Sequence, residues 1–485
     1  MGMSGSVLRR CLHAPLTRLA AQAPPRVFVL LGENAPGDPE LLRLADAVVL
    51  VESPRSATIL LVAGSLPDCL CEPAQRIHDQ MAHPRGTVWW VKSASLAANA
   101  NGRPAGVVPE PLIVTEAVSD DSVGALVVAL KRAQYDIVTG ARDSEVDIQP
   151  DIDPAPWRDV GPYGQGGSGM TGGVPYGRPL AERAPDRDSL ELDQLPVRIG
   201  PFLPAFPSGF VLDVQLQGDV VQSAAVSAEP VVHLPPIFIE ALDQPVAVAV
   251  IERERARSHL RWLAHALRVH GLTALGRRTL RLASQLADDF ARTSACAAEL
   301  HGISRRVDRS GILWWTTRGV GLLGSDAAAT LGPIARAAGM RDDARINEPA
   351  YQKLGFEPIM QTRGDSSARL RQRIAEAAQS LDLALRANGA HAWGDGVVEG
   401  PRGLVTRTER PETRLYRLLP GLLAGLEWGD VVTTVVSVDP GPGGDVRSVL
   451  PWTVKAKMTQ ASATASATAS ATAGAMGMGQ MSHGT

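Results

Sequence analysis

The sequence predicts an α/β domain over residues 1–150, followed by a mainly helical domain with a small antiparallel sheet. As a whole, the chain is therefore of the α+β or α/β class. Two observations carry this prediction. Short apolar runs alternate with a helical segment in the first third, and long stretches of helical period dominate after residue 250. Strands that alternate with helices are typical of a doubly wound parallel sheet.

Three short apolar runs open the first part, at residues 26–31, 47–51 and 58–63, each bounded by Gly, Pro or polar residues. Continuous apolar runs of this length are typical of strands that are buried on both faces. A helical segment at residues 72–81 precedes a further apolar run at 87–91. We therefore expect a parallel sheet that is covered on both sides.

Residues 151–196 are rich in Gly and Pro, and we interpret them as a linker. The spacing of Gly167, Gly169 and Gly172 matches the dinucleotide-binding fingerprint. However, no strand precedes these glycines, and Pro175 follows where a helix should begin. At the other end of the chain, residues 459–485 begin with a repeat of Ala, Ser and Thr, and we expect a disordered low-complexity tail.

Residues 197–458 are predicted to form the mainly helical domain. Apolar and polar residues alternate from Gly209 to Gly218, which indicates the first strand of an antiparallel hairpin. A helical period runs through residues 252–290, with Gly271 separating two helices, and a third helix is predicted at 367–387. The apolar runs at 245–251 and 431–438 have the length of strands.

Composition excludes several classes of protein. With 485 residues and a formal net charge of -3, the chain lacks the strongly basic character of nucleic-acid-binding proteins, so we expect no nucleic-acid partner. Four cysteines are too few for a disulfide framework. No apolar run approaches the roughly 20 residues of a membrane-spanning helix. We therefore expect a soluble protein or one that is peripheral to a membrane.

Arginine is dense between Glu252 and Arg318, where 13 Arg stand against 6 Asp and Glu. Such a stretch is typical of solvated helix faces with ion pairs. The alternative is a docking face for an acidic partner or for anionic lipid headgroups. The sequence leaves both interpretations open.

The second part carries four motifs in a recognisable order. They are GPFLPAFPSG at 200–209 with LQGD at 216–219, ERERARSHL at 252–260, the spaced pattern from GPIAR at 332–336 to Ser380, and EGPRG at 399–403. From about residue 197 to 455, these motifs resemble the large, quinone-site subunit of complex I (respiratory NADH dehydrogenase) and the large subunits of membrane-bound nickel-iron hydrogenases.

The first part is similar to the small partner subunit of the same assemblies, which carries an iron-sulfur cluster. The similarity rests on SPRSATILLVAG at 53–64 and HDQMAHPR at 78–85. It implies a doubly wound, flavodoxin-like domain. The chain therefore resembles a fusion of small and large subunits that are joined by the linker.

The sequence departs from both families at the metal ligands. An iron-sulfur cluster needs thiolates, usually four, yet no cysteine occurs between Cys71 and Cys296. The hydrogenase nickel site needs a Cys-x-x-Cys pair after Asp-Pro, and here Asp439-Pro is followed by Gly441 and Gly444 at the two places. The resemblance therefore implies that both the Fe–S and the Ni–Fe centre are absent and that the chain has no metal site.

In complex I, quinone reduction uses a His from the opening hairpin and a Tyr from a following helix. Here Leu203 or Phe206 stands at the His position, and no Tyr occurs between Tyr176 and Tyr351. We therefore expect an apolar cleft beneath residues 200–209, without a proton donor, in which quinone can still bind. No catalytic residue is predicted. The candidates for the quinone cleft are Leu203, Phe206, Arg336 and Asp343. The candidates for ion pairs or partner contacts are Arg255, His259, Arg345, Asp365 and Arg369.

These observations favour a complex I-like or hydrogenase-like subunit without its own redox centre, with a structural or coupling role. Its expected partners are the membrane subunits of a complex I-like or antiporter-like ion-translocating assembly, together with other hydrophilic redox subunits. Its expected location is cytoplasmic, peripheral on the inner face of the plasma membrane. Two alternatives stay open: an active NADH dehydrogenase (quinone)-type oxidoreductase subunit that binds quinone, and a free ligand-binding protein.

Overall fold

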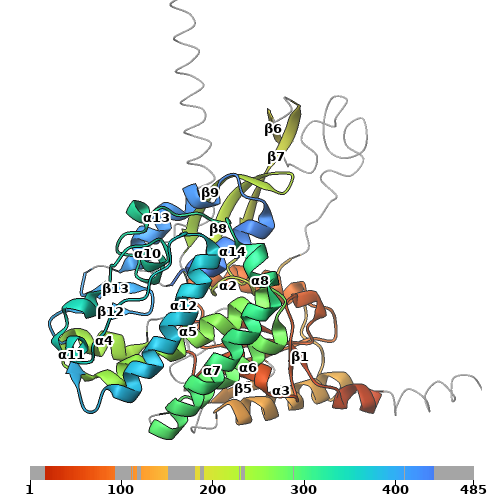
Figure 1. Ribbon diagram of the computed structural model, residues 1–485. Coiled ribbons are helices and arrows are strands. Elements are labelled where there is room, and N and C mark those ends of the chain that lie inside the picture. Colours follow the sequence, from red (N-terminus) through yellow and green to blue (C-terminus); the bar gives the residue numbers. More distant parts are fainter. Residues whose placement is uncertain are drawn as a thin grey trace, which may run out of the picture. The chain divides into compact units, whose positions relative to one another are not determined.

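The computed structural model describes residues 17–92, 111, 113–116, 122–150, 181–185, 190–228, 230, 235–287, 289–408 and 410–441. The glycine-rich stretch 161–173, Gly444 and the predicted tail 459–485 lie outside these residues. Figure 1 shows the arrangement of the helices and strands.

The first part contains a five-stranded sheet with the order β2-β1-β3-β4-β5, in which every pair of neighbours is parallel. Its strands are β1 (Arg26–Leu31), β2 (Val49–Leu50), β3 (Ile59–Ala63), β4 (Gly86–Val91) and β5 (Ile113–Glu116). This order is that of the flavodoxin type of doubly wound fold. The fold class predicted from the apolar runs is confirmed.

Both faces of this sheet are covered. Helix α3 (Ser122–Thr139) packs on one face through Leu126 and Leu130, and α2 (Asp68–Asp79) packs on the other through Leu70. Every residue of β3 and β4 is buried as a result, which is why both strands read as continuous apolar runs. The link between β1 and β2 contains the short 3-10 helix η1 (Pro39–Leu44). A second 3-10 helix, η2 (Pro54–Ser56), lies between β2 and β3.

A four-stranded antiparallel sheet follows, with the order β6-β7-β8-β9. Its strands are β6 (Glu182–Pro185), β7 (Glu191–Ile199), β8 (Val211–Gln217) and β9 (Val220–Ala228). The hairpin predicted at Gly218 is the β8–β9 turn, but β8 is the third strand rather than the first. Strand β6 and residues 191–196 of β7 lie inside the segment that was predicted to be a linker, and β7 continues to Ile199. The sequence hid β7 because Leu192 and Leu195 are exposed, so it lacks a buried apolar face.

The long helices α5 (Val248–Val269), α6 (Thr273–Gln285), α7 (Phe290–Ser310) and α12 (Ser366–Arg386) pack around one apolar core. Gly271, with a φ of 80°, ends α5 as the sequence predicted. The remaining helices and strands are α4 (Pro236–Asp243), β10 (Val246–Ala247), α8 (Ile312–Thr317), α9 (Ser325–Ala328), α10 (Pro333–Ala337), η4 (Ala344–Asn347), α11 (Pro349–Lys353), β11 (His391–Ala392), β12 (Val397–Gly400), β13 (Gly403–Thr406), α13 (Pro411–Leu423) and α14 (Trp428–Val438).

Two apolar runs of strand length are mainly helical. In α14, Val431, Val435 and Val438 are buried at helical spacing and face a core that also contains residues of β8, β9 and α13. At 245–251, only Val246 and Ala247 form a strand, and α5 begins at Val248. A short apolar run does not distinguish a strand from a buried helix, so the length of these two runs did not decide their secondary structure.

The two parts pack on each other between η1, the loop 200–209, α5 and α6. Phe202 of the loop lies in the apolar cluster on one face of the parallel sheet, and Ser208 Oγ donates a hydrogen bond to the carbonyl oxygen of Leu31. Three ion pairs join the parts: Arg261–Asp38 at 3.4 Å, Arg268–Glu52 at 2.8 Å and Arg277–Asp46 at 2.5 Å.

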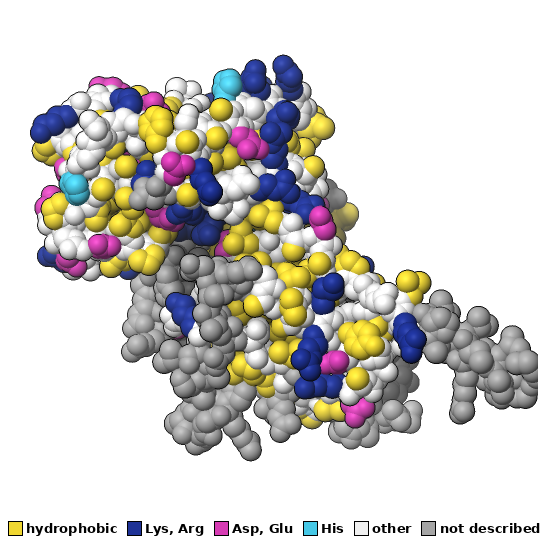
Figure 2. Space-filling view, turned by 90° about the horizontal axis from the view of Figure 1, so that it is seen from below, with side chains coloured by type: hydrophobic (Ala, Val, Ile, Leu, Met, Phe, Trp, Pro, Cys, Tyr) yellow, Lys and Arg dark blue, Asp and Glu magenta, His cyan; other side chains and the backbone are white. Residues whose placement is uncertain are grey.

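Among the described residues, no helix is long and apolar enough to cross a membrane. Figure 2 shows one face of the molecule, on which Lys and Arg side chains gather in a group along one border, beside exposed hydrophobic side chains.

Candidate functional site between the two parts

A cleft of about 280 Å³ lies between β1, η1, the loop 200–209 and α5. We call it the seam cleft. Its apolar walls come from both parts and include Phe28 and Leu50 of the first part, and Leu203, Phe206 and Trp262 of the second. Two further hollows, of about 380 and 540 Å³, adjoin it on either side of η1.

The loop 200–209 is held in place by a glycine. Gly200 has a φ of 105°, and a Cβ at this position would overlap the carbonyl oxygen of Phe210. The loop therefore starts in close contact with the beginning of β8, a position that only glycine tolerates. From this fixed start, Leu203 and Phe206 reach the seam cleft, and their role in binding quinone stays a prediction.

Asp439 anchors one end of the seam cleft. It follows α14 in the left-handed conformation, with a φ of 52°, and its carboxylate accepts hydrogen bonds from Arg402 Nε at 3.0 Å and Arg373 Nη1 at 2.8 Å. Burial by itself would raise the pKa of Asp439, but the two guanidinium groups outweigh it and lower the pKa to about 2. Asp439 is therefore ionised at neutral pH and ties α12, the β12–β13 turn and α14 together.

His265 on α5 also lines the seam cleft. An arginine can only donate, so Nδ1 must accept the contact from Arg268 Nη2 at 2.9 Å, and Nε2 carries the hydrogen that faces the carbonyl oxygen of Ala205 at 3.0 Å. Burial, and then the charge of Arg268, lower the pKa of His265. The cleft was expected to be apolar and without a proton donor. His265 is a titratable side chain in its lining, although both of its ring nitrogens are engaged.

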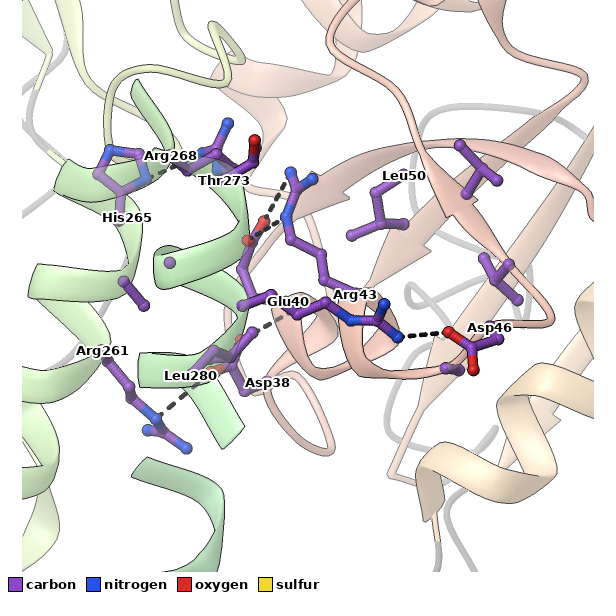
Figure 3. A pocket seen from close by; sticks show the side chains of 16 residues that line it. Asp38, Glu40, Arg43, Asp46, Leu50, Arg261, His265, Arg268, Thr273 and Leu280 are labelled. Carbon is purple, nitrogen blue, oxygen red and sulfur yellow. Dashed lines mark hydrogen bonds and ion pairs between the residues drawn. The ribbon is translucent and has the colours of Figure 1, made fainter. Parts of the chain in front are cut away.

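The hollow of about 380 Å³ beside η1 is lined by side chains of opposite charge. In Figure 3 the side chains of Arg261 and Asp38 reach toward each other across it. Glu40 pairs with Arg43 at 2.6 Å. In this hollow, the ion pairs Arg261–Asp38 and Arg277–Asp46 join the two parts of the chain, whereas Glu40–Arg43 lies within the first part.

Arg336 and Asp343, which were predicted in the quinone cleft, lie instead in a buried charge cluster. Its members are connected by ion pairs of 2.7 to 3.4 Å. The charge cluster comprises Glu252, Arg255, Arg336, Asp343, Arg345, Glu376 and Glu399. The prediction failed because the family motif gave the order of these residues but not the direction of their side chains.

The charge cluster contains four carboxylates and three guanidinium groups, so one carboxylate lacks an equivalent of positive charge. Glu399 is the carboxylate of this cluster with a raised pKa, about 7. Burial raises it most, and the neighbouring charge of Asp343 adds to this, although Arg336 Nη1 lies 3.0 Å away. Asp343, between Arg345 and Arg336, has a pKa well below its usual range despite burial. One proton held by Glu399 makes the cluster neutral.

His259 lies beside this cluster, with Nε2 3.6 Å from Glu376 Oε2. Neither of its ring nitrogens has a hydrogen-bond partner among the described residues, and burial lowers its pKa to about 3. It is therefore a neutral, buried side chain. Arg255 and Arg345, from the same group of candidates, are members of the charge cluster.

Asp365 and Arg369 hold the start of α12. Asp365 caps the helix by accepting from the backbone N–H of Ala368 at 2.8 Å. Arg369 donates to carbonyl oxygens of Gly364 and Gly321 and to the hydroxyl of Ser437. Burial lowers the pKa of Arg369 to about 9. Both side chains therefore hold backbone groups around the start of α12, and Arg369 also links this helix to α14.

The residues at the expected metal positions do not fit metal ligation. A Cβ on Gly441 would lie 2.7 Å from Glu412 Oε1 and 2.8 Å from Arg402 Nε, so a cysteine has no room there unless these side chains move. Cys69 and Cys71 lie on α2, and burial raises the pKa of both thiols, that of Cys71 to about 11. A metal-binding cysteine needs the opposite shift.

Sequence reasoning missed His265, Arg268 and Arg373 as residues of the site. Arg402 and Asp439 were within motifs that it used, but only as landmarks. The density of arginine after Glu252 was the one signal that pointed to Arg268. Nothing in the sequence indicated that Asp439 would accept hydrogen bonds from Arg402 and Arg373, which stand 37 and 66 positions earlier in the chain.

Residues 249–420 match the family model described as respiratory-chain NADH dehydrogenase, 49 Kd subunit. The chain thus contains a complex I 49 kDa subunit-like domain, which extends from α5 into α13.

No curated protein matches the chain. Among solved structures, it is similar to a chain in the structure of the membrane-bound sulfane sulfur reductase, an archaeal respiratory membrane complex. The identity is 16%, the TM-score is 0.42, and the match covers 53% of this chain and 98% of that chain.

Proposed function

We propose that the chain is a complex I-like subunit that fuses a small-subunit-like and a large-subunit-like part and carries neither an Fe–S nor a Ni–Fe centre of its own. Its role is structural or coupling, in a membrane assembly that translocates ions. Its partners are membrane subunits of the complex I or antiporter type, with other hydrophilic redox subunits. The chain lies on the cytoplasmic face of that membrane.

The observation that carries this proposal is the packing at Gly441. Arg402 and Glu412 occupy the space that a cysteine side chain at this position needs, and Arg402 is held there by Asp439. The ion pair of Arg402 with Asp439 stands where the resemblance would place a metal ligand. In this proposal the position joins the β12–β13 turn to α14 and binds no metal.

Isolation of the tagged chain from membranes in mild detergent tests this proposal. Membrane subunits should co-purify in stoichiometric amounts. A chain that is recovered from the soluble fraction alone, without membrane subunits, would refute the proposed role and would favour a free ligand-binding protein.

A second candidate function, quinone binding, is favoured by one observation, the seam cleft itself. Its aromatic and aliphatic walls suit a flat apolar ring, and its volume of about 280 Å³ is close to the lower limit for small-molecule sites. His265 is neutral and both of its nitrogens are engaged, so it offers no free proton for a reduced quinone.

Titration calorimetry with a short-chain quinone tests this candidate. Leu203→Trp would fill the seam cleft and should weaken binding at least tenfold, whereas Leu192→Trp on the exposed face of β7 should leave it unchanged. Equal affinity in the two variants would exclude the seam cleft as the quinone site. Quinol formation from a reduced partner, lost in Leu203→Trp, would make the chain an active oxidoreductase subunit.

A further inference from the structure

A surface at the end of α7 combines exposed apolar and basic side chains and has no role in the site described above. Gly311, with a φ of 65°, ends α7, and α8 begins at the next residue. Leu313 and Thr317 of α8 face the core and are buried. The opposite face of α8 therefore points away from the protein.

That outer face carries two large apolar side chains. Trp315 is 82% exposed and Ile312 is 64% exposed, and they stand three residues apart, on the same side of the helix. Exposure of this extent is unfavourable in water. Trp314, the residue before Trp315, packs against Arg371 of α12. The guanidinium carbon of Arg371 lies 3.8 Å from the centroid of the Trp314 ring, and this contact attaches α8 to α12.

Exposed basic side chains flank α8 in the sequence on both sides. Arg305, Arg306 and Arg309 on the last turns of α7 and Arg318 after α8 are all exposed. The only acid between residues 305 and 318 is Asp308, which pairs with Arg371 at 3.4 Å. The stretch thus carries four Arg against one Asp, a net charge of +3, around two exposed apolar side chains.

We propose that this surface, which we call the α8 patch, binds the headgroup region of an anionic lipid bilayer. Trp is the residue that favours the membrane–water interface, and arginines near it attract anionic lipids. The patch is the outer face of a short helix, and the three hollows described above lie on other elements. A basic and aromatic surface on the outside of a helix fits a lipid layer better than it fits a peptide segment.

This inference deepens the proposed function, because it names the surface through which the chain contacts the membrane directly. It places Ile312 and Trp315 among the headgroups and the arginines beside lipid phosphates. Burying a tryptophan side chain in this way is worth roughly tenfold in the partition coefficient. Each arginine near the surface adds about fivefold.

Sedimentation of the full chain with lipid vesicles is the test. The bound fraction should be low with phosphatidylcholine alone, should rise when phosphatidylglycerol is included, and should fall again at high salt. Trp315→Ser should weaken binding to the mixed vesicles about tenfold. The pair Arg306→Glu and Arg309→Glu should weaken it at least as much.

Phe290→Ser and Arg292→Glu are matched controls, because both side chains are exposed at the opposite end of α7. They should bind like the wild type, and all variants should keep its melting temperature. Equal binding by the α8 patch variants and the wild type would overturn the inference, as would binding that appears only when membrane subunits are added. A chain that binds vesicles but co-purifies with no membrane subunit would refute the proposed function alone.

Discussion

The side chains of Arg402 and Asp439 form the joint that closes one end of the seam cleft. Arg402 Nε lies 3.0 Å from Asp439 Oδ2 and 3.1 Å from its carbonyl oxygen, so one guanidinium group fixes both the side chain and the backbone at the end of α14. Arg373 approaches the same carboxylate from α12. The geometry of the cleft therefore depends on a single, largely buried acid.

Replacement of that acid should destabilise the protein strongly. Asp439→Asn leaves the guanidinium groups of Arg373 and Arg402 without their carboxylate, and removing one partner of a buried ion pair costs about 3 kcal/mol or more. Urea unfolding measures this loss. Asp382→Asn removes the exposed pair with Arg386 at 2.6 Å and should change stability by less than about 0.5 kcal/mol. Similar losses in the two variants would show that Asp439 is not a joint.

Glu399 should make stability depend on pH near neutrality. Its pKa in the folded protein is about 7, above the value of 4.5 for an ordinary Glu. Between these values the folded state holds a proton that the unfolded state has released, so the free energy of unfolding falls as pH rises from 4.5 to 7. In Glu399→Gln this contribution, at most about 1.4 kcal/mol per pH unit, should disappear. Parallel pH profiles for the wild type and the variant would contradict the assignment of the proton to Glu399.

The space around Gly441 should reject even a methyl group. Gly441→Ala places a Cβ within 2.8 Å of Arg402 and Glu412, and such overpacking costs typically about 1–3 kcal/mol. Thermal unfolding measures it. Gly421→Ala on α13 is the control, because nothing lies within 4 Å of its Cβ and alanine favours a helix. An unchanged melting temperature in Gly441→Ala would mean that the position has room for a metal-binding cysteine.

The sequence was sufficient for β1 to β4 of the parallel sheet, because each is part of a continuous apolar run between polar or glycine-containing loops, but it did not indicate β5. It was insufficient for β7, whose Leu192 and Leu195 are exposed and whose partners are set by pairing with β8. It also left the segment 431–438 ambiguous. Only packing against α13 and the antiparallel sheet selects a helix there.

The candidate site could be predicted only in part for a related reason. Leu203 and Phe206 were found because a loop motif places them together along the chain. Arg336 and Asp343 were assigned to the wrong surroundings, because side-chain direction depends on helices that are distant in sequence. His265 was missed since nothing local distinguishes it from other histidines on helices.

The metal content of the purified chain tests the central claim most directly. Iron, nickel and acid-labile sulfide should be measured after purification without oxygen, so that no cluster is lost by oxidation. The account predicts a colourless protein in which each is well below one atom per chain. A brown protein with about four irons and matching sulfide per chain would contradict it. Such a cluster is held by cysteine thiolates, whereas here no cysteine of the chain is expected to bind a metal.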